Sequence, residues 1–319
     1  MQLGVVYPQT DMEADPGAIK HYVEVVEALG FRHILAYDHV VGVNPQSRPS
    51  WGTHPYTVDS QFHDPFSLFS FMAGVSDKLG FVTGILILPQ RQTALVAKQA
   101  ACLDVLCNGR FRLGVGIGWN EAEYETLGVP WEARGRRLEE QVEVMRKLWT
   151  ERSVSFKGEF HSIPDVGLKP LPIQRPLPVW FGGGSDRPRF NDQKAREPVM
   201  RRIARLADGW IPQIGRRERM LELLGRMHEL LREYGRDPAK FGLEAGVIAN
   251  RATADQWADD VKFWRDAGAN YLTVNAILDG LKGVDQHIKR LEEFRSAVPA
   301  GAGEVADKPG ARPVSEARP

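Results

Sequence analysis

The stretch Arg110–Gly128, RFRLGVGIGWNEAEYETLG, decides how the rest of the chain is interpreted. A short apolar strand, Phe111–Val115, runs into the alternating glycines Gly114, Gly116 and Gly118. Glycine has no Cβ, so it lets a flat ligand or a neighbouring strand come close to the backbone. The glycines therefore indicate either a strand end shaped around a ligand or tight packing inside a barrel, and this stretch alone favours neither.

The composition is that of an ordinary globular protein. The chain has 319 residues, of which 43% are hydrophobic and 26% charged, enough for a substantial core. Lys plus Arg and Asp plus Glu both number 41, so charge gives no argument for binding nucleic acid or an acidic membrane. No signal-peptide pattern opens the sequence and no apolar run is long enough to span a bilayer. We therefore expect a cytoplasmic protein.

Strand and helix patterns alternate along the chain. The predicted strands are Leu3–Tyr7, His33–Tyr37, Leu79–Leu88, Phe111–Val115, Pro178–Phe181, Trp210–Pro212, Phe241–Ile248 and Tyr271–Ala276. The predicted helices are Pro16–Leu29, Pro65–Lys78, Thr93–Leu106, Trp131–Trp149, Pro198–Leu206, Glu218–Tyr234, Ala254–Ala267 and Val284–Ala297. Eight such pairs imply an α/β fold, a (β/α)8 TIM barrel over residues 1–298, with a doubly wound open sheet as the alternative.

Three insertions interrupt this alternation, after strands two, four and five. They are Gly42–His63, Thr150–Pro176, which contains a predicted hairpin over Val154–Ile163, and Gly183–Glu197. Loops that follow barrel strands form the catalytic face, so the first and third insertions should border the site. Residues 299–319 are rich in Ala, Gly and Pro and lack periodicity, which predicts a disordered tail.

Polar residues and glycines follow several predicted strands. Asp38 and His39 follow strand two, where a carboxylate beside an imidazole can orient a ligand and move a proton, or can simply cap the loop backbone. The turn Gly182–Ser185 follows strand five, and its successive backbone N–H groups favour phosphate binding over a flexible hinge. The sequence Thr83–Ile85 places a glycine inside strand three, which indicates a bulge, a close backbone approach or a bend.

Other motifs are interpreted as structural. The glycines of Gly114–Gly118 lack the dinucleotide spacing, no helix is predicted directly after them, and no phosphate-binding P-loop occurs. The histidines show no metal-ligand spacing, and Cys102 and Cys107 face different sides of one predicted helix, so no metal site is expected. Arg134–Arg137, His161 and His228 are predicted to be solvated surface residues.

Taken together, these residues resemble the bacterial luciferase-like monooxygenase superfamily, and most closely its coenzyme F-420 (deazaflavin)-dependent oxidoreductase branch. The resemblance covers residues 3–297. It is carried by the order and spacing of Ala36–His39 (AYDH), Val82–Ile85 (VTGI), Gly109–Phe111 (GRF), Gly114–Trp119 (GVGIGW), Glu121–Gly128, Leu138–Trp149 (LEEQVEVMRKLW), Pro178–Gly184 (PVWFGGG) and Ala207–Trp210 (ADGW).

The resemblance implies a barrel that holds a flavin or deazaflavin at its C-terminal mouth. Asp38 matches a residue that contacts the polar edge of the ring, and His39 matches a proton donor. A non-prolyl cis peptide that backs the ring is expected at Gly84–Ile85, beside Thr83. The remaining cofactor contacts implied are Asn120 and the phosphate-contacting Gly182, Gly183, Gly184 and Ser185.

One departure from the family is visible in the sequence. Members that act on glucose phosphate carry a catalytic Glu just before the Asn that matches Asn120. This chain has Gly118 and Trp119 there, which argues against that substrate and that proton acceptor. Trp51, His54, Tyr56 and Trp119 are instead candidates for the substrate side, and their character indicates an organic, partly apolar small molecule.

The implied activity is hydride transfer between reduced coenzyme F-420, an 8-hydroxy-5-deazaflavin, and this organic substrate. Replacing Asp38 or His39 by Ala is then expected to reduce turnover more than stability. An FMN-dependent monooxygenase that uses oxygen and reduced flavin from a separate reductase is the alternative. A barrel that binds a cofactor or metabolite without catalysis is a second alternative. Because family members are commonly dimers, a homodimer is expected.

Overall fold

The computed structural model describes residues 1–48, 56–185, 193–213, 216–249, 252–277 and 280–298. Two predicted substrate residues, Trp51 and His54, lie outside these ranges, as does the predicted tail at 299–319. Within the described ranges, no helix has both the length and the apolar character needed to cross a membrane.

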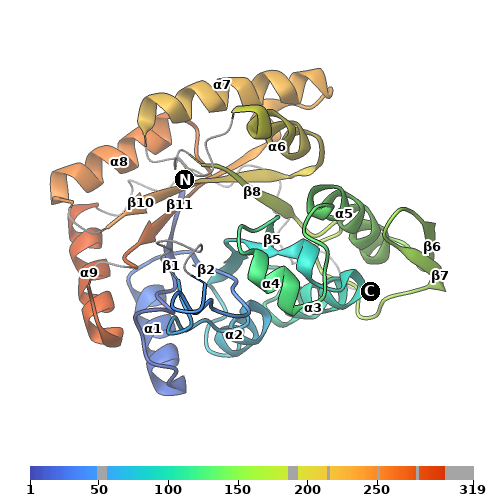
Figure 1. Ribbon diagram of the computed structural model, residues 1–319. Helices are drawn as coiled ribbons and strands as arrows, with labels where there is room; N and C mark the ends of the chain where they lie inside the picture. Colours follow the sequence, from blue (N-terminus) through green and yellow to red (C-terminus); the bar gives the residue numbers. More distant parts are fainter. Residues whose placement is uncertain (49–55, 186–192, 214–215, 250–251, 278–279, 299–319) are drawn as a thin grey trace.

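The described strands close into a parallel barrel (Figure 1). Its strands are β1 (Gln2–Val6), β2 (His33–Ala36), β3 (Gly80–Thr83), β4 (Leu86–Ile87), β5 (Phe111–Gly116), β8 (Val179–Ser185), β9 (Gly209–Gln213), β10 (Gly242–Ile248) and β11 (Tyr271–Asn275). β3 pairs with both β2 and β5, while β1 pairs with β11, so the sheet has no open edge. β3 and β4 are two parts of one barrel strand, because both pair with β5. The eight predicted strands and the barrel are thus confirmed, and the open sheet is excluded.

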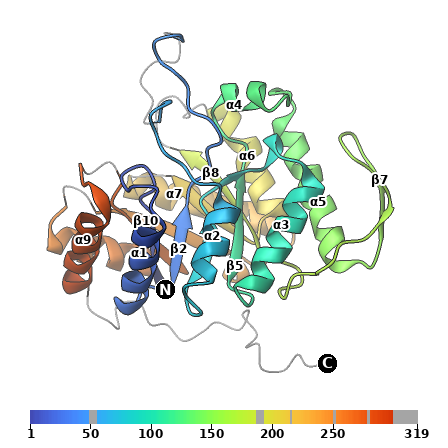
Figure 2. The ribbon, with the colours of Figure 1, turned by 90° about the horizontal axis from the view of Figure 1, so that it is seen from below.

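Helices cover the outside of the barrel, except for α4 (Glu121–Thr126), which lies at the C-terminal end of the strands (Figures 1 and 2). They are α1 (Pro16–Ala28), α2 (Pro65–Ala73), α3 (Thr93–Leu106), α4 (Glu121–Thr126), α5 (Arg134–Thr150), α6 (Gln193–Leu206), α7 (Arg217–Glu233), α8 (Ala254–Asp266) and α9 (Gly283–Ala297). Their starts follow local sequence. Asp15 and Asp64 each accept a hydrogen bond from a backbone N–H in the first turn, directly before a proline at the first helical position, which is the favoured arrangement at a helix N-terminus.

Several boundaries differ from the sequence prediction. The helix that begins at Pro65 ends at Ala73 rather than Lys78, and the helix predicted from Pro198 begins at Gln193. The third strand is broken after Thr83, where the glycine inside it indicated an irregularity. The helix α4 begins two residues after Trp119, where no helix was predicted. A six-residue helix is too short to show a hydrophobic repeat, which explains why periodicity missed it.

The predicted hairpin is confirmed as β6 (Val154–Lys157) and β7 (Ser162–Val166), which pair antiparallel. It lies outside α5, away from the barrel (Figures 1 and 2). Figure 2 shows α4 and the segment after β2 at the same end of the barrel. This is the C-terminal end of the strands, where the loops that follow β2 and β5 begin.

A buried ionic cluster closes the opposite end of the barrel. Glu244 of β10 is 1% exposed and forms ion pairs with Arg112 of β5 at 2.6 Å and with His33 of β2 at 2.8 Å. The Arg112 guanidinium lies over the Tyr271 ring at 3.6 Å and over the Trp180 ring at 4.7 Å. Burial opposes ionisation of Glu244, but Arg112 and His33 outweigh it and lower the pKa of Glu244 to about 2.

Glu244→Gln is expected to destabilise the barrel in a pH-dependent way. A carboxyl whose pKa is lowered by folding contributes its full stability above its unfolded value and loses it as pH falls. The contribution of Glu244 should therefore disappear between about pH 4.5 and pH 2. At pH 7 the variant should lose about 3 kcal/mol of unfolding free energy.

Urea denaturation of wild type and variant across this range gives the difference directly, with the exposed Glu24→Gln as the control. A difference that stays constant from pH 7 to pH 2.5 would contradict the assignment.

Candidate active site

The alternating glycines of β5 make room for the third barrel strand. A Cβ on Gly114, Gly116 or Gly118 would clash with this strand. It would lie 1.9 Å from O of Thr83, 2.6 Å from Cδ1 of Ile85 and 2.7 Å from Cγ2 of Ile87, respectively. Real Cβ atoms are not found this close to other atoms. Of the two interpretations left open by the sequence, close packing inside the barrel is the one that the structure supports.

The break in the third strand has the geometry that the family resemblance implies. The peptide bond between Gly84 and Ile85 is cis, which confirms the expected position. Directly before it, the Thr83 hydroxyl donates a hydrogen bond to O of Gly114 at 2.7 Å and is fully buried. The side chain of Ile85 approaches Gly182 of β8, where a Cβ would lie 2.6 Å from its Cγ2. Ile85 thus lies across the barrel between β5 and β8.

Asp38 is buried at the end of β2 and both of its oxygens are occupied. Its Oδ2 accepts from the Ile87 N–H at 2.9 Å and from Nε of Arg91 at 3.3 Å, and its Oδ1 accepts from the Arg91 guanidinium at 2.6 Å. Burial is the largest influence and raises the pKa of the Asp38 carboxyl, while Arg91 and the Ile87 N–H offset part of that effect. In the structure this side chain holds β4 in place, so it has a structural role beside the cofactor contact that the resemblance implies.

His39 follows Asp38 and lies among aromatic rings at the barrel mouth. Its side chain is 9% exposed. Three rings surround the imidazole, with centroid distances of 4.8 Å to Phe62, 5.1 Å to Tyr56 and 5.4 Å to Trp119. Two of the predicted substrate residues, Tyr56 and Trp119, are therefore brought to His39. The third ring, Phe62, was not singled out from the sequence.

A buried carboxylate that the sequence analysis missed also contacts His39. The Glu123 side chain is fully buried, and its Oε1 lies 3.2 Å from Nδ1 of His39. The same oxygen accepts from the Val40 N–H at 2.7 Å. Glu123 belongs to α4, whose N-cap is Asn120. The sequence did carry a signal for this helix, because Asn followed three residues later by Glu is an N-terminal capping pattern.

Asn120 itself is held by the chain. Its Oδ1 accepts from the Ala122 N–H at 3.1 Å, which caps α4, and its Nδ2 donates to O of Val41 at 3.4 Å. Asn120 thereby joins the loop after β5 to the loop after β2. Its expected contact with a ring or an anionic tail stays a prediction.

The barrel mouth is open above an apolar floor. Glu244, Gly246 and Ile248 alternate on the inward face of β10. Gly246 is exposed although it lies mid-strand, and Ile248 is 60% exposed. A Cβ on Gly246 would meet only O of Thr273 at 4.0 Å. The floor consists of Val6, Leu35, Val82, Trp180, Ile211 and Ile277, with Tyr37 and Ile85 packed against it. An open, apolar seat beside the cis peptide fits a planar ring.

Gly182–Ser185, predicted as a turn after strand five, instead forms the end of β8 itself, at the rim of this mouth. The register is irregular between Gly182 and Ser185, and Gly184 has φ of +73°, a conformation that suits glycine. The Trp210 indole donates to O of Gly183 at 2.7 Å, which holds this strand end. The side chain of Ser185 lies outside the described part of the chain. Phosphate binding here stays a prediction.

The surface assignments from the sequence hold only in part. Arg136 is exposed as predicted, whereas Arg134, Arg137 and His161 are partly or largely buried. The Arg134 guanidinium lies 3.6 Å over the Trp131 ring, and the Nε atoms of Arg134 and Arg137 are buried without a hydrogen-bond partner among the described residues. His161 is largely buried, with Nδ1 2.7 Å from Glu140 and Nε2 2.5 Å from the Thr93 hydroxyl. It ties the hairpin to α5 and α3. Charge and polarity alone gave no indication of these contacts.

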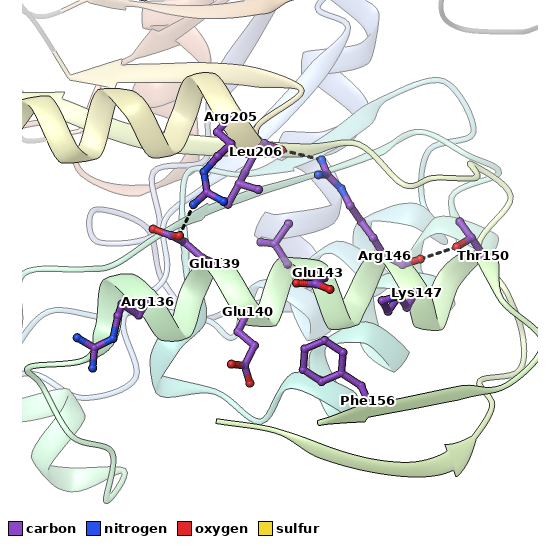
Figure 3. A pocket seen from close by; sticks show the side chains of 11 residues that line it. Arg136, Glu139, Glu140, Glu143, Arg146, Lys147, Thr150, Phe156, Arg205 and Leu206 are labelled. Atoms are coloured by element: carbon purple, nitrogen blue, oxygen red, sulfur yellow. Dashed lines mark hydrogen bonds and ion pairs between the residues drawn. The ribbon is translucent and has the colours of Figure 1, made fainter. Parts of the chain in front are cut away.

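A groove of about 620 Å³ lies on the outer surface, between α5, β6 and the end of α6 (Figure 3). Its charged side chains are largely paired with one another or with nearby residues. Glu139 contacts Arg202 and Arg205, and Arg146 contacts Asp208. None of the sequence-predicted site residues lines it. The barrel mouth, not this groove, brings the candidate residues together.

Comparison with known proteins identifies the family of the chain. The sequence profile described as luciferase-like monooxygenase matches residues 1–308. The chain belongs to the luciferase-like monooxygenase family. An uncharacterized protein of Mycobacterium tuberculosis is 37% identical over 57% of the chain and 62% of its own length. The FMNH(2)-dependent dimethylsulfone monooxygenase of Pseudomonas putida is 37% identical over 42% of the chain and 38% of its own length. The chain thus matches less than two thirds of the length of either relative.

Solved structures share the fold at low sequence identity. The monooxygenase RslO1 from Streptomyces bottropensis has a TM-score of 0.73 and 18% identity, covering 93% of this chain and 98% of that one. An F420-dependent secondary alcohol dehydrogenase in complex with an F420-acetone adduct has a TM-score of 0.71 and 18% identity, covering 92% and 99%. Family members and structural neighbours of this luciferase-like barrel therefore include enzymes of both cofactor types.

Asp38→Asn is expected to lower the free energy of unfolding by about 3 kcal/mol, because it leaves the Arg91 charge with no buried carboxylate. The matched control is Asp64→Asn, which removes the second carboxylate near Arg91, is 38% exposed and keeps an Asn at the N-cap of α2. Urea denaturation of both variants tests this. Equal losses for the two would show that Asp38 has no structural role of its own.

Proposed function

We propose that the chain is an oxidoreductase in which hydride passes between reduced coenzyme F-420 and a neutral, partly apolar organic substrate, with His39 transferring the proton. The observation that carries the proposal is the placement of His39. It lies at the mouth of the barrel, 9% exposed and ringed by Phe62, Tyr56 and Trp119. When bound, the reduced deazaflavin supplies the hydride chemistry.

The residues of the chain would contribute three things to this reaction. The floor around Ile85 and the exposed Gly246 would seat the ring at the mouth. The glycine-rich end of β8, Gly182–Ser185, would hold an anionic tail with backbone N–H groups. The aromatic side chains around His39 would exclude water from the substrate and leave the imidazole as the polar group that can exchange a proton with it.

Reduced FMN with oxygen is the second candidate. The observation that favours it is the 37% identity to an FMNH(2)-dependent monooxygenase over 138 residues. The motif Ala36–His39 favours the deazaflavin branch instead. With FMN the chain would need a flavin reductase as a partner. For either cofactor we propose a homodimer, the common state of the family.

Titration of the purified protein with each cofactor separates these candidates. We expect F-420 to bind at least about tenfold more tightly than FMN, with binding followed by the change in cofactor absorbance and fluorescence. Tighter binding of FMN would replace the first candidate by the second. Binding of neither would contradict both.

His39→Asn is expected to lower kcat about 10²-fold or more with any substrate that the wild type reduces, because general acid–base catalysis contributes that much. Cofactor affinity should stay within about threefold. His228→Asn is the control, since this half-buried histidine lies on α7 in the outer helical layer. A kcat for His39→Asn equal to that of the control would remove His39 from the reaction.

A further inference from the structure

We propose that Glu123 is a positioning residue that fixes His39 with its proton on Nδ1, which makes Nε2 the nitrogen that exchanges a proton with the substrate. The role of Nε2 in proton exchange with the substrate rests on the proposed function. The tautomer itself follows from the contacts of Glu123, none of which depends on which cofactor binds.

One oxygen of Glu123 settles the direction of the hydrogen bond. Oε1 contacts the Val40 N–H at 2.7 Å and Nδ1 of His39 at 3.2 Å. The backbone N–H of Val40 can only donate, so Oε1 accepts there. An ionised carboxylate has only acceptor sites, so Nδ1 of a neutral His39 must carry the proton. The Val40 contact also prevents the carboxylate from turning away from the imidazole.

The second oxygen of Glu123 forms no hydrogen bond among the described residues that would compete with the His39 contact. Oε2 is buried and has no hydrogen-bond partner among the described residues. Among the described residues, Glu123 forms an ion pair with His39 and with no other side chain. A buried carboxylate without another cation is costly. The contacts with Nδ1 of His39 and the Val40 N–H are therefore the interactions that the described residues give this buried carboxylate.

The imidazole is also prevented from turning over. Phe62 and Trp119 meet its plane nearly edge-on, at 68° and 66°, and Tyr56 is tilted by 53°. With Nδ1 turned toward Glu123, the opposite edge of the ring carries Nε2. The packing and the hydrogen bond together therefore define which nitrogen is free to meet a substrate.

The proton step is balanced in this arrangement. In the reductive direction the N–H bond at Nε2 of the imidazolium would break, and its proton would pass to the substrate atom that gains electron density as the substrate is reduced. A bound reduced deazaflavin would supply the hydride for that reduction. The electron pair of that bond stays on Nε2. His39 is left neutral with its proton on Nδ1, still donating to Glu123, and it regains a proton at Nε2 from solvent water.

The sequence explains why this carboxylate lies at position 123. The residue directly before Asn120 is Trp119, so no carboxylate enters the site from that position. In this chain the Asn caps α4, and Glu123 is the third residue of the helix. A carboxylate therefore reaches the site from α4, and it acts through His39 rather than on the substrate.

The test is ¹⁵N NMR of histidine-labelled protein at about pH 9, where a free imidazole is neutral. The His39 signals are assigned by their loss in His39→Asn. We expect wild type to carry the proton on Nδ1. Glu123→Gln should keep it there, because its Oε1 can still accept from Val40 and His39, whereas Glu123→Met should give a mixture of tautomers. Glu125→Gln, an exposed change in the same helix, is the control.

A wild-type His39 that carries its proton on Nε2 would overturn the inference, and this result needs no variant to fold. An unchanged spectrum in a folded Glu123→Met would overturn it too.

With a substrate in hand, a kinetic test becomes possible. Glu123→Met should lower kcat about 100-fold with KM within about twofold, and Glu123→Gln should retain most of the wild-type kcat. In a protein that already carries His39→Asn, adding Glu123→Met should not lower kcat further. If the tautomer is as expected but His39→Asn stays active, the proposed function fails while the positioning stands.

Discussion

The third barrel strand approaches β5 so closely that three alternate positions of β5 have no space for a side chain. This constraint sets the rest of the site. It requires Gly114, Gly116 and Gly118, and it brings the Thr83 hydroxyl onto the β5 backbone. It also places the Ile87 N–H within reach of Asp38 at the end of β2. The ends of β2, the third barrel strand and β5 are thereby held together by contacts within the chain itself.

The same constraint determines where the acid and the imidazole meet. Gly118 has φ of +65°, so the chain turns sharply where β5 ends. Asn120 then begins α4 and bonds to the loop after β2, and the first turn of α4 presents Glu123 to His39. The loops after β2 and β5, the two strands that flank the third barrel strand, thus depend on each other, because each loop supplies one residue of the His39–Glu123 pair.

Much of the fold was predictable from the sequence, because long apolar repeats and helix caps carry most of that information. The eight strands, the hairpin and the barrel follow from them. The site was predictable in part, because the residue matches placed the cis peptide at Gly84–Ile85. That Tyr56 and Trp119, proposed for the substrate side, both contact His39 emerged only from the structure. The contacts of Asp38 with β4 and Arg91 were also not predictable, since a sequence does not show that Arg91 lies beside it.

The sequence analysis missed residues that belong to no local motif or hydrophobic repeat. Glu123 lies in a helix too short to show a repeat. Arg112 and Glu244 lie in strands whose other residues are mostly apolar. Nothing in the local sequence shows that these two side chains contact each other across the barrel interior. Partners of this kind lie on different strands or loops, and their pairing is set by barrel register. Only the closed barrel reveals it.

The ionic cluster at the N-terminal end of the barrel also limits how a ligand can reach the barrel interior. Glu244, His33 and Trp180 are nearly inaccessible, and Arg112 fills the remaining space between two aromatic rings. Side chains therefore close the N-terminal end of the described barrel. A small molecule that reaches the barrel interior would have to approach from the C-terminal end, past the residues around His39.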